Sequence, residues 1–179
     1  MTFYDKIKGQ VSELREKFNY KDDGTAFGHF MIKECFNKIV NFGFEGLDFD
    51  DYIHRHLVDM AYDQGNDVIF TNKETNQILI FQAKFSNNRL LNTDEIKKNK
   101  GFIDFILGLS NEKLELNSKL KKVIDEEISS VLNADNLRDK NYSITVFYVD
   151  NSFDNKIKND IKALYTNYYD QGIDLEVKF

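Results

Sequence analysis

The sequence predicts an α/β fold in which helices flank a mixed β-sheet. Segments with apolar residues at three- and four-residue steps alternate along the chain with short β-branched and aromatic runs. The predicted order is two helices, about three strands, two helices, a strand, a helix and a strand, which is typical of a sheet covered by helices. With 179 residues and no internal repeat, low-complexity tract or linker, the chain is expected to form one domain over 1–179.

Two helices are expected at the start of the chain. The first has apolar residues at helical spacing: Phe3, Ile7, Val11, Leu14 and Phe18. The second begins near Gly24 or Thr25, and its apolar face places Glu34 on the buried stripe. A buried carboxylate needs a partner or a metal, so Glu34 is a candidate ligand; pairing with a neighbouring lysine is the alternative. The segment 41–51 is expected to be a loop, and the apolar alternation in 53–58 predicts the first strand.

A β-hairpin is predicted in the middle of the chain. Residues 68–70 and 78–81 are apolar runs that flank the polar segment 71–77. Asp67 precedes the first run, and Gln82 and Lys84 follow the second on one face of the strand. The hairpin would bring a carboxylate, an amide oxygen and an ammonium around one small volume. This combination suits a hard cation beside a phosphate.

The second half of the chain supplies the remaining elements. A helix is expected from Thr93, with Lys97, Lys98 and Lys100 outside its buried face, and a long helix over 112–132. The apolar run 142–149 does not alternate, which predicts an interior strand. A last helix ends at Gly172, and residues 175–179 form a closing strand.

Composition and charge limit the function classes. The hydrophobic fraction of 41% is that of a folded protein, and no apolar run of about 18 residues predicts a membrane span. The single cysteine, Cys35, excludes an internal disulfide and fits a cytoplasmic location. The net charge of -6 argues against a general nucleic-acid-binding surface. However, residues 84–122 hold nine basic against five acidic residues, so Lys97, Lys98 and Lys100 either contact phosphates or form a solvated face.

The motif Asp63-x-Gly65-x-Asp67, the hairpin and Gln82-x-Lys84 together resemble the PD-(D/E)xK nuclease superfamily, in its Mrr-like branch. The wider layout resembles the amino-terminal domain of abortive-infection phage-resistance (AIPR) proteins. This resemblance implies a restriction-endonuclease-like αβββαβ core. Because AIPR proteins are larger, we expect the chain to be either their amino-terminal part or a complete short protein.

The resemblance also implies an activity, namely metal-dependent endonuclease cleavage of DNA or RNA in bacterial anti-phage defence. Asp67, Gln82 and Glu34 would hold Mg²⁺, for which Mn²⁺ can substitute. Lys84 would orient the attacking water or stabilise charge on the phosphate. Asp63 would shape the turn, with Gly65 allowing an unusual backbone angle.

The same residues are compatible with two other functional interpretations. The glutamine at a position where the superfamily has a carboxylate, together with the acidic net charge, suits a catalytically impaired nuclease-fold module that binds nucleic acid or a protein partner. A metal-dependent enzyme with a non-nucleic substrate is the third option. A homodimer and further domains of the same chain are the protein partners to consider, and no membrane partner is expected.

Overall fold

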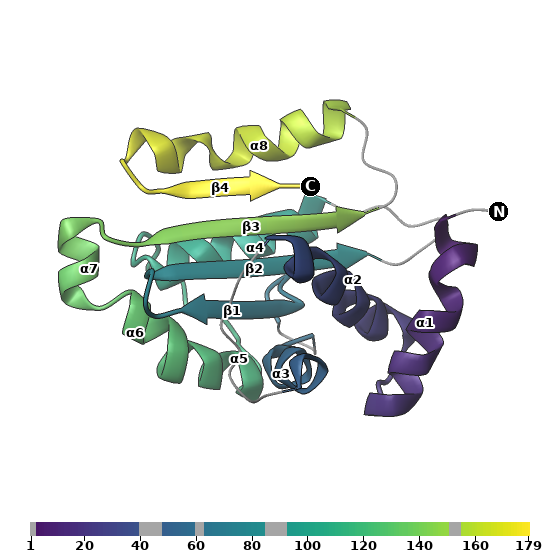
Figure 1. Ribbon diagram of the computed structural model, residues 1–179. Coiled ribbons are helices and arrows are strands. Elements are labelled where there is room, and N and C mark those ends of the chain that lie inside the picture. The colour runs from purple at the N-terminus through teal and green to yellow at the C-terminus, as the bar shows by residue number, and fades with distance from the viewer. Residues whose placement is uncertain (1–2, 40–47, 60–62, 85–92, 151–154) are drawn as a thin grey trace.

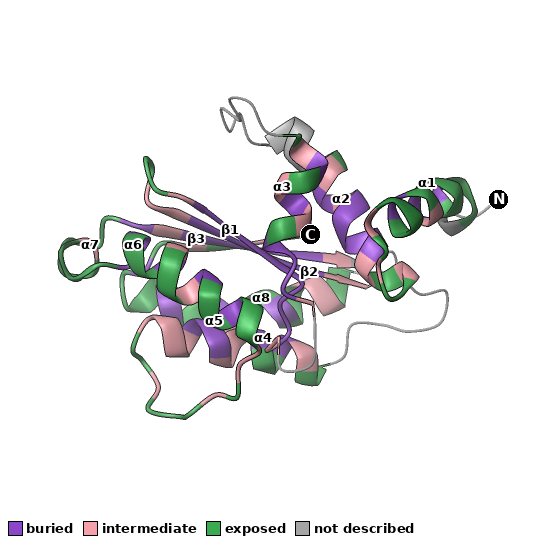
Figure 2. Cartoon of the chain, turned by 90° about the horizontal axis from the view of Figure 1, so that it is seen from below, coloured by how far each residue is buried: buried purple, intermediate pink, exposed green. Residues whose placement is uncertain are grey.

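The computed structural model describes residues 3–39, 48–59, 63–84, 93–150 and 155–179. A four-stranded sheet lies between two groups of helices (Figure 1, Figure 2). The strands are β1 (Val68–Asn72), β2 (Gln77–Lys84), β3 (Ser143–Asp150) and β4 (Leu175–Lys178). The helical segments are α1 (Phe3–Phe18), α2 (Asp23–Ile39), α3 (Phe49–His56), α4 (Thr93–Ile106), α5 (Ser118–Val123), the π-helix η1 (Ile124–Ile128), α6 (Ser129–Val131), α7 (Ala134–Asp139) and α8 (Asn155–Asp170).

The sheet is mixed, as predicted, with the strand order β1-β2-β3-β4. β1 and β2 form the predicted antiparallel hairpin, whereas β3 runs parallel to β2 and β4 runs parallel to β3. The Asn72 side chain accepts hydrogen bonds from the backbone N–H groups of Glu74 and Thr75, which closes the hairpin turn. β3 lies between two strands and is apolar on both faces, so the prediction of an interior strand is confirmed.

Side chains of β2 alternate between the two layers. Ile78 and Ile80 pack in the core formed with α4, α5 and α8, and Leu79 and Phe81 pack against α2 and α3. Figure 2 shows these two groups of helices on opposite sides of the sheet. Gln82 continues the first series, so its side chain lies on the α4 side of the sheet.

The strand predicted over 53–58 is wrong, because residues 53–56 form the last turn of helix α3 and Leu57 ends it. Asp48 caps that helix, since its side chain accepts from the backbone N–H of Asp50 at 2.9 Å. Ile53 and Leu57 are four residues apart and both buried, which is a helical spacing that outweighs the short alternation. Only Leu57 pairs with the sheet, through an isolated antiparallel bridge to Val68. The predicted loop 41–51 lies in part outside the described residues, and its last residues belong to α3.

The long helix predicted over 112–132 begins only at Ser118. Asn117 caps it by accepting from the backbone N–H of Leu120 at 2.8 Å, and its amide donates to the Val58 carbonyl at 3.0 Å. The segment before Asn117 is not helical, although Leu114 and Leu116 pack on the core. Among the helices that the structure describes, none is both long and apolar enough to cross a membrane.

Candidate functional site

The structure brings together the three hairpin residues that the sequence singled out. Asp67 directly precedes β1, and Gln82 and Lys84 lie at the end of β2. The backbone N–H of Asp67 donates to the carbonyl of Phe81, the partner of Val68, at 2.8 Å, which continues the hydrogen bonding between the two segments beyond β1. All three line one pocket of about 400 Å³, whose opposite wall is the first turns of α4.

Asp67 is buried, with 9% of its surface exposed. One carboxylate oxygen accepts from the Ala83 backbone N–H at 2.6 Å, and both oxygens lie 3.3 Å from the Gln82 side-chain nitrogen. Burial, followed by the charge of Asp59, raises the pKa of Asp67 well above its ordinary value, and the bond from Ala83 only partly opposes this. An ionised Asp67 is therefore costly unless a positive charge lies beside it.

Gln82 is also buried, with 5% of its surface exposed. Its amide oxygen has no hydrogen-bond partner among the described residues, which is unusual for a buried polar atom. Rotation about the terminal side-chain bond would place this oxygen beside the Asp67 carboxylate. Two oxygens can share that position only with a cation or a proton between them. The pair therefore fits a hard divalent cation, which prefers carboxylate and amide oxygens.

Two further carboxylates approach Asp67. Oxygen atoms of Asp59, Asp63 and Asp67 all lie within 4.8 Å of one another. The Asp59 backbone N–H donates to the Asp67 carbonyl at 3.2 Å, and the same carbonyl accepts from Val58 at 2.8 Å. Burial raises the pKa of Asp63 to about 6, and the neighbouring Asp59 adds to this rise. The cluster supplies oxygen ligands of the kind that Mg²⁺ and Mn²⁺ take.

The predicted role of Asp63 in the turn agrees with its contacts. Its side chain accepts from the Gly65 backbone N–H at 2.8 Å, and Gly65 has a φ of +72°. Behind this turn, the buried Asn99 of α4 donates to the Asn66 side chain at 2.8 Å. Asn99 in turn accepts from Tyr148 and from Tyr165 at 3.0 and 2.9 Å. This buried network fixes the turn against α4 and so positions Asp63 and Asp67.

Lys84 forms an ion pair with Glu95 in the first turn of α4. Both side chains are about one-fifth to one-quarter exposed, so the pair lies at the pocket wall and not in the core. Lys98, one turn further along α4, lines the same pocket. The charges of Lys84 and Lys98 lower the pKa of Asp67 and of Asp63, respectively, against the effect of burial. The pocket as a whole still carries five carboxylates and two lysines.

Other predicted site residues lie elsewhere. Glu34 is exposed, so the expectation that it lies on the buried stripe is wrong, and it lines a separate pocket beside Lys33 and Asp50. The structure therefore does not bring Glu34 to Asp67. Lys100 pairs with Asp104 at 2.8 Å and its ammonium lies 5.0 Å from the centre of the Tyr168 ring, so it faces α8.

The sequence analysis did not identify Asp59 and Glu95 as pocket residues. Asp59 follows the segment 53–58, for which the sequence predicts a strand, and its position depends on the backbone contact with Asp67 beside β1. Glu95 lies in the first turn of a helix, where the helix dipole favours acidic residues in any case. Its presence there therefore does not indicate a contact with Lys84. Neither position has a local pattern that would distinguish it.

Comparison with protein-family models, with curated proteins and with solved structures finds no match to this chain. The resemblance to PD-(D/E)xK nucleases and AIPR domains therefore stays a prediction based on the motif and the layout. The function has to be argued from the pocket itself.

Proposed function

We propose that this chain is a metal-dependent nuclease that hydrolyses phosphodiester bonds of DNA or RNA. The observation that carries this proposal is the contact between a buried carboxylate, Asp67, and the buried amide of Gln82, whose oxygen lacks a partner among the described residues. Lys84 lies in the same pocket. A pair of cation ligands next to an ammonium suits phosphodiester hydrolysis, because the cation polarises a water molecule and the ammonium stabilises negative charge on the phosphate.

The charge of the pocket supports a requirement for metal. With five carboxylates and two lysines, the pocket would repel a phosphodiester anion. Asp67 and Gln82 would hold Mg²⁺, with Asp63 and Asp59 completing the oxygen set. When bound, this cation would supply the positive charge that offsets the carboxylates and polarises a water molecule.

Lys84 and Glu95 have a different task. The Lys84 ammonium can donate to a non-bridging phosphate oxygen, where negative charge increases in the transition state. Glu95 accepts from Lys84 and so fixes the ammonium at the pocket wall. Lys98 offers a second positive charge on the same wall.

The order of elements is compatible with the αβββαβ core of the resembled superfamily. The Leu57–Val68 bridge stands where that core has its first strand. β1, β2, α4 and β3 then follow in the corresponding order. In this interpretation the first strand is reduced to a single bridge. A role in anti-phage defence rests on the sequence resemblance alone.

A cleavage assay with Mg²⁺ or Mn²⁺, and with EDTA as the control, tests the proposal. Single-stranded and duplex DNA and RNA serve as substrates. We expect cleavage that EDTA abolishes and that Asp67→Asn eliminates. Lys84→Ala should lower turnover by about a hundredfold, the scale for losing a positioned electrostatic group, while Mn²⁺ still binds. Lys113→Ala removes an exposed lysine outside the pocket and should cleave like the wild type.

Two results would contradict the proposal. One is full activity in folded Asp67→Asn protein. The other is tight Mn²⁺ binding without cleavage of any of the four substrates. The second result would favour the alternative, a nuclease-fold module that binds without cleaving. The ion pair that already occupies Lys84 is the structural feature that agrees with this alternative.

A further inference from the structure

A second pocket adjoins the pocket that contains Asp67, Gln82 and Lys84, which we call the carboxylate pocket. Its volume is about 500 Å³, and it shares Asp22 and Asp59 with the first pocket as common walls. Its other walls include Phe18, Tyr20 and His54. A molecule that reached from one pocket to the other would therefore pass Asp59.

The aromatic wall is a cluster of three half-buried rings. The Phe18 ring lies 5.0 Å from the His54 ring and 5.6 Å from the Tyr20 ring, at interplanar angles of 23° and 26°. The Tyr20 and His54 rings lie 5.4 Å apart and are tilted by 43°, so the three rings form one compact aromatic cluster. Proteins that bind single-stranded nucleic acid use such aromatic surfaces to stack bases.

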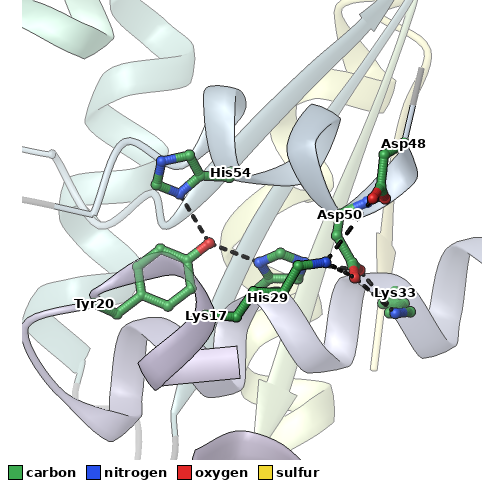
Figure 3. A network of polar contacts seen from close by, with 7 residues as sticks. All are labelled: Lys17, Tyr20, His29, Lys33, Asp48, Asp50 and His54. Carbon is green, nitrogen blue, oxygen red and sulfur yellow. Dashed lines mark hydrogen bonds and ion pairs between the residues drawn. The ribbon is translucent and has the colours of Figure 1, made fainter. Parts of the chain in front are cut away.

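A chain of hydrogen bonds leads from the protein interior to this wall (Figure 3). His29 is fully buried, and its Nε2 lies 3.3 Å from Asp50. Its Nδ1 lies 2.7 Å from the Tyr20 hydroxyl, which lies 3.1 Å from Nδ1 of His54. Asp50 also binds Lys17 at 3.0 Å and Lys33 at 2.8 Å.

The direction of this chain follows from Asp50. Although burial opposes it, bonds from Lys33 and Lys17 lower the pKa of Asp50 to about 2, so the carboxylate can only accept. His29 must then donate from Nε2, and burial lowers its pKa, so it is neutral and accepts at Nδ1 from Tyr20. The Tyr20 oxygen in turn accepts from Nδ1 of His54. The chain therefore leaves Nε2 of His54 as a hydrogen-bond acceptor.

Positive charge lies on the other side of His54. A third pocket, with a volume of about 430 Å³, shares His54 and Lys119 with the aromatic pocket and is also lined by Arg55 and Lys122. These three cationic side chains are exposed. Two glutamates line the same pocket, but Glu127 is bound to His56 at 3.0 Å, and Glu126 lies 3.9 Å from Lys122. Burial, followed by the charge of Lys119, lowers the pKa of His54, and the charge of Asp51 only partly opposes this.

We propose that the Phe18–Tyr20–His54 pocket binds one unpaired base of a nucleic-acid strand, while Lys119 and Arg55 bind its neighbouring phosphates. A ring of this cluster would receive the face of the base, and Nε2 of the tilted His54 ring would accept from an N–H at its edge. In a duplex, the face of a base is stacked on its neighbours and its edge is paired, so the ligand is single-stranded DNA or RNA. This inference rests on the proposed function, because it assigns the strand that would lead to the carboxylate pocket.

Fluorescence anisotropy with short labelled DNA and RNA single strands, and with the matching duplexes, tests this site. EDTA is present throughout, so binding is measured without cleavage. Arg55→Ala combined with Lys119→Ala should weaken single-strand binding by tenfold or more. The slope of log K against log salt should become shallower by about 1.4, from ~0.7 for each lost phosphate contact. Lys121→Ala, an exposed lysine of α5 that lines neither pocket, is the matched control and should bind like the wild type.

His54→Asn separates the aromatic site from a structural role. The asparagine amide can still donate to Tyr20, but the ring and its acceptor are removed. We expect binding to weaken about fivefold or more, the scale for losing one stacked base, with an unchanged melting temperature. Because the chain has three histidines, ¹⁵N NMR can resolve their rings. The His54 ring should show the Nδ1–H tautomer and should shift on addition of the oligonucleotide, while the buried His29 changes little.

The outcomes distinguish this inference from the proposed function. Wild-type binding in both variants, equal binding of duplex and single strand, or an absence of oligonucleotide binding by the wild type would overturn the inference. Each can occur whether or not the chain cleaves nucleic acid with metal. Conversely, loss of cleavage with intact single-strand binding would overturn the nuclease proposal and leave this site in place.

Discussion

At the scale of single residues, the proposed metal site depends on the contact between Asp67 and Gln82. Both side chains are buried, one as a carboxylate with a raised pKa and the other with an unpartnered oxygen within the described part of the chain. A buried polar group without a partner typically costs about 1–3 kcal/mol. A bound ligand can remove this cost by acting as the missing partner. A cation between Asp67 and Gln82 would do so for both side chains.

Asp67→Asn should change how stability depends on pH. A carboxyl group whose pKa is raised by folding stabilises the protein below its unfolded pKa, and this contribution is lost as the pH rises through the folded value. Asparagine has no such loss and can still accept from the Ala83 N–H. In EDTA, we therefore expect the melting temperature of the variant to gain on that of the wild type between pH 5 and pH 8. A difference that stays constant over this range would contradict the raised pKa.

Part of the site could be predicted from residue patterns. Alternation along a strand and hairpin pairing are local rules, and they place Asp67, Gln82 and Lys84 together. The prediction that Glu34 is buried is wrong. The burial of a residue at the edge of an apolar stripe depends on which helices pack there, and Glu34 is exposed on α2. Asp59 and His54 depend on contacts between segments, for which the sequence has no local pattern.

At the scale of elements, the turn before β1 and the start of α4 act as one unit. Gly65 has a positive φ, and a Cβ atom on it would lie 2.5 Å from the backbone oxygen of Glu95. The backbone of α4 therefore approaches the turn more closely than any side chain would allow. This approach places Glu95 beside Lys84 and Lys98 beside the carboxylates.

Gly65→Ala should reduce stability and weaken metal binding together. The left-handed backbone alone costs an alanine about 1–2 kcal/mol, and the contact with Glu95 adds to this cost. Gly9→Ala is the control, because Gly9 lies within α1 with nothing within 4 Å of the added atom. It should raise the free energy of unfolding by about 0.5–1 kcal/mol. Chemical denaturation measures the free energy of unfolding of both variants. Equal changes in the two variants would show that the turn is not held against α4.

Element boundaries show where local patterns are sufficient. The hairpin, α1 and α8 follow from periodicity together with turn residues such as Gly172, which has a φ of +69°. The segment ending in α3 was misassigned because four alternating residues suit a strand as well as the end of a helix. The cap at Asn117 decided the start of α5, although the apolar spacing continues before it.

At the scale of the whole molecule, opposite charges are separated along one path. The carboxylate pocket is acidic, whereas the exposed Lys119 lines the adjoining aromatic pocket, and Arg55 and Lys122 line the pocket beyond it. The net charge of -6 conceals this arrangement. The basic excess in 84–122 includes Lys119 and Lys122, but the sequence does not indicate which lysines share a surface. Lys100 shows the difference, since it pairs within its own helix.

The proposed function depends on Asp67 and Gln82 binding a divalent cation together. Calorimetric titration of Mn²⁺ into the wild type, Gln82→Glu and Gln82→Ala tests it most directly. A glutamate adds one negative charge to the ligand set, so Gln82→Glu should bind Mn²⁺ more tightly than the wild type. Gln82→Ala removes a ligand and should bind more weakly than either. Equal affinity of the three proteins would show that Gln82 is not a ligand and would contradict the metal site proposed here.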